Sequence, residues 1–100
     1  KYDKPLIISE VGGGALQGFH GDPGQRWTEE YQDAVYESNL KMMDNIEFLA
    51  GITPWLLNDF LSPRRNLSRI QDDYNRKGLV SQDGLKKKAF YRLQEYYKRK

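Results

Sequence analysis

A glutamate at the predicted end of a buried strand is the residue in this sequence best placed for chemistry. The apolar, β-branched run near the start predicts a strand over residues 5–11, and Glu10 lies where that strand should end. A carboxylate there is costly to bury unless it has partners or a functional role. The glycines at positions 12–14 follow directly and would let a ligand approach the backbone closely. We therefore take Glu10 as a candidate functional residue, with an ion pair to Arg64 or Arg65 as the structural alternative.

A tryptophan and three polar residues form a second constellation. Trp55 lies near the end of a second predicted strand, where it could belong to the core or present its ring to a sugar. Sugars stack their apolar C–H faces on aromatic rings, while their hydroxyl groups need polar partners. Asn58, Asp59 and Arg64 follow closely in the sequence and could supply the polar wall of such a pocket.

Other chemistries fit the sequence poorly. The glycine-rich segment fails as a dinucleotide site, because Gln17 stands where the third glycine is required and no helix is predicted to begin there. His20 and Asp22 form an isolated His-x-Asp pair, and cysteine is absent, whereas a zinc site needs at least three protein ligands. We therefore expect neither a metal nor a cofactor.

The overall charge argues against two classes of partner. Sixteen lysines and arginines against fourteen acidic residues give a net charge of +2, too mild to require a nucleic acid or an anionic membrane. The lysine-rich runs at 86–88 and 98–100 are expected to be solvated helix faces. No apolar run approaches the ~20 residues that cross a bilayer. We expect a soluble protein, for which the bacterial periplasm and cytoplasm both stay open.

The elements that must position these residues alternate between strand and helix. The predicted strands cover 5–11 and 52–57, and the predicted helices cover 28–49, ended by Gly51, and 85–100. Helical spacing predicts inner faces, made in the first helix by Tyr31, Ala34 or Val35, Ser38, Met42, Ile46 and Leu49, and in the last by Ala89, Phe90, Leu93, Tyr96 and Tyr97. Long loops follow each strand, the second running from 62 to about 77. A βαβα order favours parallel strands, and two strands alone do not make a stable sheet. The chain is therefore predicted to be α/β, as part of a barrel or of a doubly wound sheet. In both folds chemistry gathers at the carboxyl ends of the strands.

Several motifs stand in order along nearly the whole chain: Lys4-Pro5-Leu6-Ile7-Ile8-Ser9-Glu10-Val11-Gly12, Gly18-Phe19-His20-x-Asp22-Pro23, Thr28-Glu29-Glu30-Tyr31-Gln32, Gly51-x-x-Pro54-Trp55-x-x-x-Asp59-Phe60, Asn75-Arg76-Lys77-Gly78-Leu79-Val80 and the lysine-rich Ala89-Phe90 helix. Together these motifs resemble glycoside hydrolase family 2, and within it the β-glucuronidases and β-galactosidases.

The resemblance implies a fold and a mechanism. Residues 1–100 would be the C-terminal part of a catalytic (β/α)₈ TIM barrel, its last two strand–helix units. Glu10 would be the nucleophile of a retaining exo-β-glycosidase. The family's acid/base glutamate lies in an Asn-Glu pair, and this sequence contains no such pair. The isolated chain is therefore expected to be inactive. Its expected partners are a carbohydrate substrate and, to cover its strand edges, either the rest of the barrel or a second copy of itself.

The substrate is indicated by one short pattern. Asn75-x-Lys77 matches the pattern that binds the C6 carboxylate of the sugar in β-glucuronidases, which places a glucuronide slightly ahead of a galactoside. The loop containing Arg64 departs from well-known glucuronidases and leaves the galactoside open. A non-catalytic carbohydrate-binding or assembly module derived from a barrel is the alternative function. An Asn-Glu pair upstream of this segment would count against that alternative.

Overall fold

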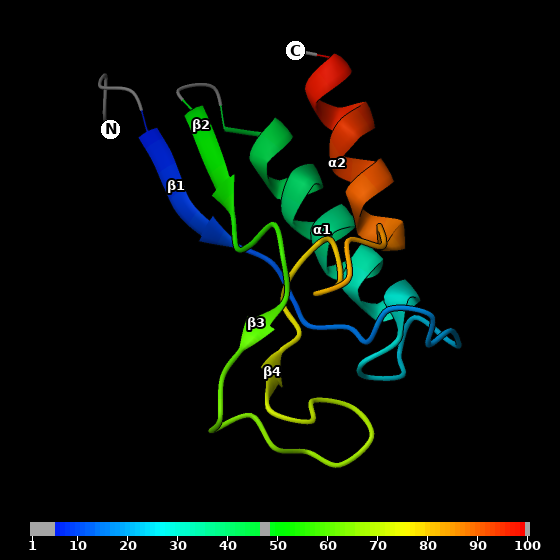
Figure 1. Ribbon diagram of the computed structural model, residues 1–100. Helices are drawn as coiled ribbons and strands as arrows, with labels where there is room; N and C mark the ends of the chain where they lie inside the picture. Colours follow the sequence, from blue (N-terminus) through cyan, green and yellow to red (C-terminus); the bar gives the residue numbers. More distant parts are fainter. Residues whose placement is uncertain (1–5, 47–48, 100) are drawn as a thin grey trace.

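A computed structural model describes residues 6–46 and 49–99 of the chain. Two long strands alternate with two helices, and a short hairpin is inserted before the second helix (Figure 1). The elements are β1 (Leu6–Val11), α1 (Glu29–Asp44), β2 (Leu49–Pro54), β3 (Phe60–Leu61), β4 (Tyr74–Asn75) and α2 (Lys88–Lys98). This order confirms the α/β prediction. None of the helices in the described ranges is long and apolar enough to cross a membrane.

Strands β1 and β2 pair in parallel, with α1 as the crossover between them. Ile8 lies opposite Ile52, and Val11 lies opposite Pro54. Two residues of β1 therefore separate these pairs, against one residue of β2, which makes an irregularity of the β-bulge type at Ser9 and Glu10. Both strands end at the same edge of the sheet, as the parallel pairing predicted.

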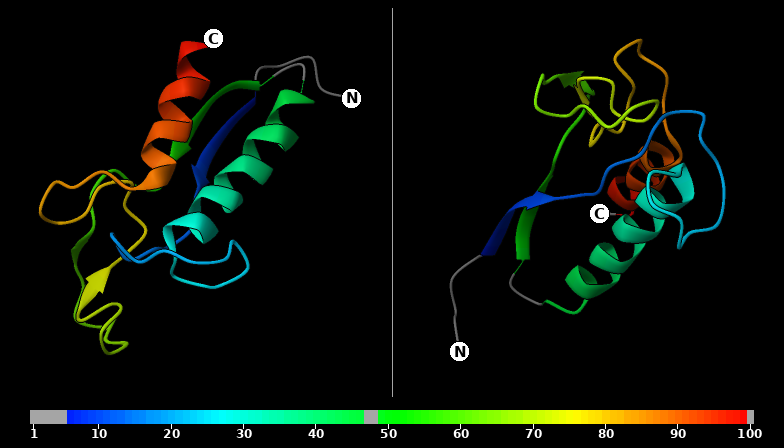
Figure 2. Two further views of the ribbon diagram at one scale, coloured as in Figure 1. Left: turned by 90° about the vertical axis from the view of Figure 1, so that its right-hand side faces the viewer. Right: turned by 90° about the horizontal axis from the view of Figure 1, so that it is seen from below.

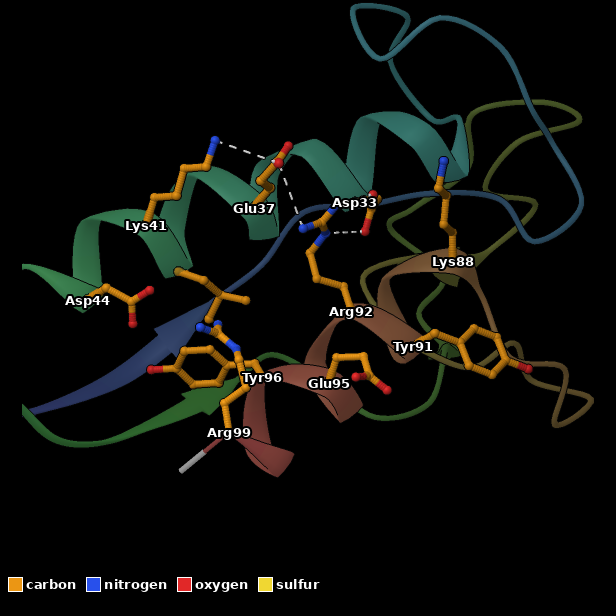
Figure 3. A pocket seen from close by; sticks show the side chains of 11 residues that line it. Asp33, Glu37, Lys41, Asp44, Lys88, Tyr91, Arg92, Glu95, Tyr96 and Arg99 are labelled. Carbon is orange, nitrogen blue, oxygen red and sulfur yellow. Dashed lines mark hydrogen bonds and ion pairs between the residues drawn. The ribbon is translucent and has the colours of Figure 1, made fainter.

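The two helices lie side by side against one face of this sheet (Figures 1 and 2). A bidentate ion pair joins them: Arg92 Nε donates to Asp33 Oδ1 at 2.6 Å, and Arg92 Nη2 donates to Asp33 Oδ2 at 3.0 Å. Glu37 adds a second carboxylate, 3.8 Å from Arg92 Nη1 (Figure 3). The forked geometry fixes the relative direction of the helices as well as their spacing.

Apolar side chains from the end of β1, both helices and the segment after β4 make the core. Its buried members are Val11, Tyr36, Leu40, Met43, Leu79, Ala89, Leu93 and Tyr96. The predicted inner face of α2 is confirmed for Ala89, Leu93 and Tyr96, whereas Tyr97 is 49 % exposed.

The first helix ends earlier than predicted, and its buried face differs. Asn45 caps it, with its N–H bonded to the carbonyls of Met42 and Met43, and Gly51 lies within β2 opposite Ile7. The prediction that Gly51 ends the helix was therefore wrong, because the chain from Leu49 onward pairs with β1 in the sheet, and residues 47–48 lie outside the described ranges. Met42, predicted to face inward, is 52 % exposed.

The buried face of α1 is not the one predicted from apolar periodicity, and three of its six buried residues are polar. Glu29, Gln32 and Asp33 are buried in α1, and each of them has a hydrogen-bond partner in another segment. Because hydrogen bonds and ion pairs offset the desolvation of these groups, the hydrophobic pattern did not reveal the inner face.

The lysine-rich run at 86–88 was predicted to be solvated, which is wrong for Lys87. Its exposed fraction is 0 %, and it occupies the N-cap position of α2 in an extended conformation rather than lying inside the helix. The second predicted loop contains a strand that was not predicted: β4 pairs with β3 in antiparallel orientation, with Phe60 opposite Asn75.

Candidate active site

The carboxyl end of β1 brings Glu10 to the edge of the sheet where the loops gather. The irregularity at Ser9 and Glu10 changes the backbone pairing there, and bulges of this kind are over-represented beside active sites. Gly12 follows with φ +147°, and a Cβ at this position would lie 2.5 Å from the Trp55 carbonyl oxygen and 2.7 Å from the Tyr36 hydroxyl. Only glycine therefore fits at position 12, two residues after the candidate nucleophile in the sequence.

Backbone hydrogen bonds join the ends of the two strands to the segment after β4. The Trp55 N–H donates to the Val11 carbonyl at 2.7 Å, and the Leu56 N–H donates to the Lys77 carbonyl at 3.2 Å. The structure therefore brings together three predicted site positions, those of Glu10, Trp55 and Lys77.

Trp55 lies just beyond β2, not within a buried strand as predicted. Its exposed fraction is 39 %, and its ring meets the Phe60 ring edge to face, with 6.4 Å between centroids. Phe60 itself is 40 % exposed. An exposed aromatic pair of this kind can stack on a sugar face, and sugar stacking by Trp55 stays a prediction.

Asp59 lies in a buried charged network. Its side chain has no exposed surface; Oδ1 accepts from Lys87 Nζ at 2.9 Å and from the Gly78 N–H at 2.9 Å, and Oδ2 lies 3.3 Å from Arg76 Nη1. With its oxygens engaged inside the protein, Asp59 is better explained as a structural residue than as the sugar-binding residue predicted. Asn58 is exposed next to it.

The segment 75–81 presents one exposed residue, Lys77. Asn75 is buried, and its Oδ1 accepts from the Lys77 N–H at 3.0 Å. This hydrogen bond links the two predicted sugar-binding residues directly. The amide nitrogen of Asn75 and the ammonium of Lys77 are both donors of the kind that a carboxylate accepts. Arg64, by contrast, is exposed in the loop between β3 and β4, which extends away from the sheet (Figure 1).

The loop between β1 and α1 is fastened to the start of α1. Glu29 Oε2 accepts from the Gly18 N–H at 2.6 Å, and Oε1 accepts from the Lys88 N–H at 2.6 Å. His20 Nδ1 lies 2.8 Å from Glu30 Oε2, and the Gly21 N–H donates to Glu30 Oε1 at 3.0 Å. His20 therefore pairs with Glu30 rather than with Asp22.

These contacts change the pKa values of both partners. The hydrogen bond to Glu30 raises the pKa of His20 above its usual 6.5. Burial raises the pKa of Glu30, but hydrogen bonds from the Gly21 N–H and from His20 outweigh it and lower that pKa to about 2. The pair therefore acts as a charged clasp for the loop when His20 is protonated.

Sequence reasoning missed the residues that hold the site together. Tyr36 is fully buried in α1, with its hydroxyl 3.4 Å from the Val11 carbonyl and 3.5 Å from the Trp55 carbonyl. Gln32 Nε2 donates to the carbonyls of Gly13 and Gly78, both at 2.9 Å. A polar residue at a helical interval of four from a tyrosine gives no sign of such a role. The contacts exist only after β1, α1 and the later segment come together.

Comparison with curated proteins shows similarity to β-glucuronidases. The chain is 35 % identical over 98 residues to β-glucuronidase of Rattus norvegicus, with 96 % of this chain and 15 % of that protein covered. It is 35 % identical over 102 residues to the Homo sapiens protein, covering 97 % and 15 %, and 33 % identical over 88 residues to the Paenibacillus borealis protein, covering 88 % and 14 %. The chain thus spans about 15 % of the length of these relatives. No family model matches the chain.

Solved structures give the same result. The β-D-glucuronidase of Dictyoglomus thermophilum matches with a TM-score of 0.82 and 32 % identity, over 97 % of this chain and 16 % of that one. A β-glucuronidase of an uncultured Clostridium matches with a TM-score of 0.83 and 30 % identity, over 99 % and 17 %. Over nearly its whole length, the chain is therefore a homologue of one segment of the β-glucuronidases.

Proposed function

We propose that this chain supplies the nucleophile and part of the sugar-binding site of a retaining β-glucuronidase. One observation carries the proposal: backbone hydrogen bonds of Trp55 and Leu56 connect the end of β1, next to Glu10, with the exposed Lys77. The similarity to β-glucuronidases over nearly the whole chain supports it. In this proposal β1 and β2 are the last two strands of a (β/α)₈ barrel. The parallel pairing and the position of the long loops beyond the strand ends support that assignment.

The proposed reaction has two steps. Glu10 attacks the anomeric carbon and forms a covalent glycosyl-enzyme, while a second carboxylic acid protonates the departing glycosidic oxygen. Water then attacks the same carbon, the second carboxylate takes a proton from that water, and Glu10 is released. The two carboxyl groups of retaining enzymes lie ~5–5.5 Å apart. We place the second carboxyl outside these 100 residues, because no Asn-Glu pair is present among them.

The proposed substrate is a glucuronide. Lys77 would meet the C6 carboxylate with its ammonium group, and Asn75 would donate from its amide nitrogen, since its amide oxygen already accepts from the Lys77 N–H. A galactoside carries a neutral C6 hydroxymethyl group and would leave the charge of Lys77 without its partner. The three relatives named above are all β-glucuronidases, which supports this choice.

Covalent trapping tests the nucleophile and the substrate together. A complete enzyme that contains this chain is incubated with equal amounts of 2-fluoro-glucuronide and 2-fluoro-galactoside reagents, and the labelled peptide is mapped by mass. We expect a glucuronyl label on Glu10. A galactosyl label on Glu10 would keep the mechanism and overturn the substrate. A label on another residue, or full hydrolysis by a Glu10→Gln enzyme, would overturn the role of Glu10. Sugar binding without hydrolysis by the complete protein would favour the non-catalytic alternative.

A further inference from the structure

Lys87 is a fully buried lysine that the proposed reaction does not use. Its exposed fraction is 0 %, and its Nζ donates three hydrogen bonds, to Ala15 O at 2.7 Å, Asp59 Oδ1 at 2.9 Å and Arg76 O at 3.1 Å. Burial lowers the pKa of Lys87, and the carboxylate of Asp59 opposes that effect. An ammonium with all three hydrogens engaged in this way is a built feature, because lysine is rarely buried without a partner.

The three acceptors come from three separate loops. Ala15 belongs to the loop between β1 and α1, Asp59 follows β2, and Arg76 follows β4. The Arg76 carbonyl also accepts from the Ala15 N–H at 2.9 Å, so that peptide is held from two sides. Lys87 therefore lies at the junction of the loops that bear the candidate site.

The segment held by this junction is the one that presents Lys77. Asp59 Oδ1, which accepts from Lys87, also accepts from the Gly78 N–H at 2.9 Å. The peptide groups on both sides of Lys77 are thus fixed, through the Arg76 carbonyl and the Gly78 N–H. The Lys77 side chain remains exposed.

We propose that Lys87, together with Asp59, is a positioning pair that holds the backbone of Lys77 and thereby sets the selectivity for a sugar carrying a carboxylate at C6. This inference rests on the proposed function, in which Lys77 binds that carboxylate. Lys87 itself touches no substrate. It fixes the backbone position from which the Lys77 side chain extends toward the substrate. Misplacement of a binding group by about 1 Å can lower a rate by up to about a hundredfold.

The pair is distinguishable from a general stabiliser by its effect on selectivity. Loss of a purely structural contact would lower the activity toward all substrates alike. Loss of the positioning pair raises KM for the charged sugar and leaves KM for the neutral sugar nearly unchanged, because only the charged sugar uses Lys77.

The test compares variants of a complete enzyme that contains this chain, with para-nitrophenyl β-glucuronide and β-glucoside as substrates, which differ only at C6. We expect Lys77→Ala to lower the ratio of the two kcat/KM values by about a hundredfold. Lys87→Met should lower the same ratio by about tenfold through KM for the glucuronide. Lys86→Met is the matched control, since Lys86 is an exposed neighbour outside the network, and it should leave the ratio unchanged.

A second variant guards against loss of folding. Lys87→Met leaves the buried carboxylate of Asp59 with Arg76 as its remaining ionic partner. The double variant Asp59→Asn/Lys87→Met removes both opposite charges at similar side-chain volume. It should show the same tenfold loss in the ratio of the kcat/KM values. An unchanged ratio in Lys77→Ala would overturn the glucuronide proposal, and this inference with it. A lowered ratio in Lys77→Ala, with an unchanged ratio in the Lys87 variants, would overturn the positioning role alone.

Discussion

At the scale of single residues, Gly12 shows how closely the backbone is packed behind the candidate nucleophile. Its φ of +147° is a conformation that side chains rarely adopt, and the Trp55 carbonyl and the Tyr36 hydroxyl fill the space that a Cβ would need. The Val11 carbonyl that precedes it already accepts from the Trp55 N–H at 2.7 Å. A shift at Gly12 is therefore transmitted directly to the strand end that carries Glu10.

We expect Gly12→Ala to destabilise the strand end by about 1–3 kcal/mol, because backbone strain adds to the steric clash. The measurement is the rate of thermal inactivation of a complete enzyme that contains this chain. Gly24→Ala is the matched control, since no atom lies within 4 Å of a Cβ built there. Equal inactivation rates for the two variants would show that the close contacts at Gly12 relax without cost.

The contrast between Glu10 and Lys87 shows what could be read from the residues. Glu10 was marked by its place after an apolar run and before three glycines, both of which are local in sequence. Lys87 stands among three consecutive lysines, and nothing in that run separates it from its exposed neighbours. Its partners are 72, 28 and 11 residues away, so only the assembled fold reveals its role.

At the scale of elements, strand order and topology followed from the sequence, whereas boundaries and faces did not. Short β-branched runs separated by an amphipathic segment predict a parallel βαβ unit, and β1, α1 and β2 confirm it. The inner face of α1 uses Gln32 and Asp33, whose burial depends on partners far along the chain. The β3–β4 pair was missed because each strand has two residues, too few for any periodicity.

The β1–α1 loop should loosen as the pH rises. Its clasp joins His20 to Glu30, with Glu29 favouring and Lys88 opposing the protonated imidazole. Because the folded-state pKa of His20 is raised above 6.5, its stabilisation is fully present below pH 6.5 and is lost as pH rises through the raised value. Glu30, with a pKa of about 2, keeps its charge across this range.

Hydrogen exchange measures this prediction. Protection factors of the amides at 18–21 should fall between about pH 5 and about pH 9, after correction for intrinsic exchange. In a His20→Gln variant the neutral amide cannot titrate, and the protection should be lower at acidic pH and nearly independent of pH. Protection that rises with pH in the unchanged protein would contradict the clasp.

At the scale of the whole molecule, the chain leaves apolar surface and both sheet edges uncovered within the described residues. Its radius of gyration is 14.5 Å, compared with about 13 Å for a compact domain of this length. Leu57, which follows β2, is 59 % exposed, and Leu61 in β3 is 64 % exposed. An apolar groove crosses from the end of β2 to α2, lined by Pro54, Leu56, Leu57, Leu79, Phe90, Leu93, Gln94 and Tyr97. Surfaces of this kind are normally buried by further structure.

We therefore expect the 100-residue chain, produced alone, to self-associate and to show no hydrolysis of para-nitrophenyl β-glucuronide. Sedimentation velocity gives its association state, and the release of nitrophenol gives its activity. The loss of activity has a separate cause, the missing second carboxyl, so a Leu57→Ser/Leu61→Ser variant should become less associated without gaining activity. Co-expression with the remainder of a β-glucuronidase should restore hydrolysis, because it covers the groove and supplies the acid together. A monomeric, active chain would contradict both the proposed barrel and the division of the two carboxyl groups between segments.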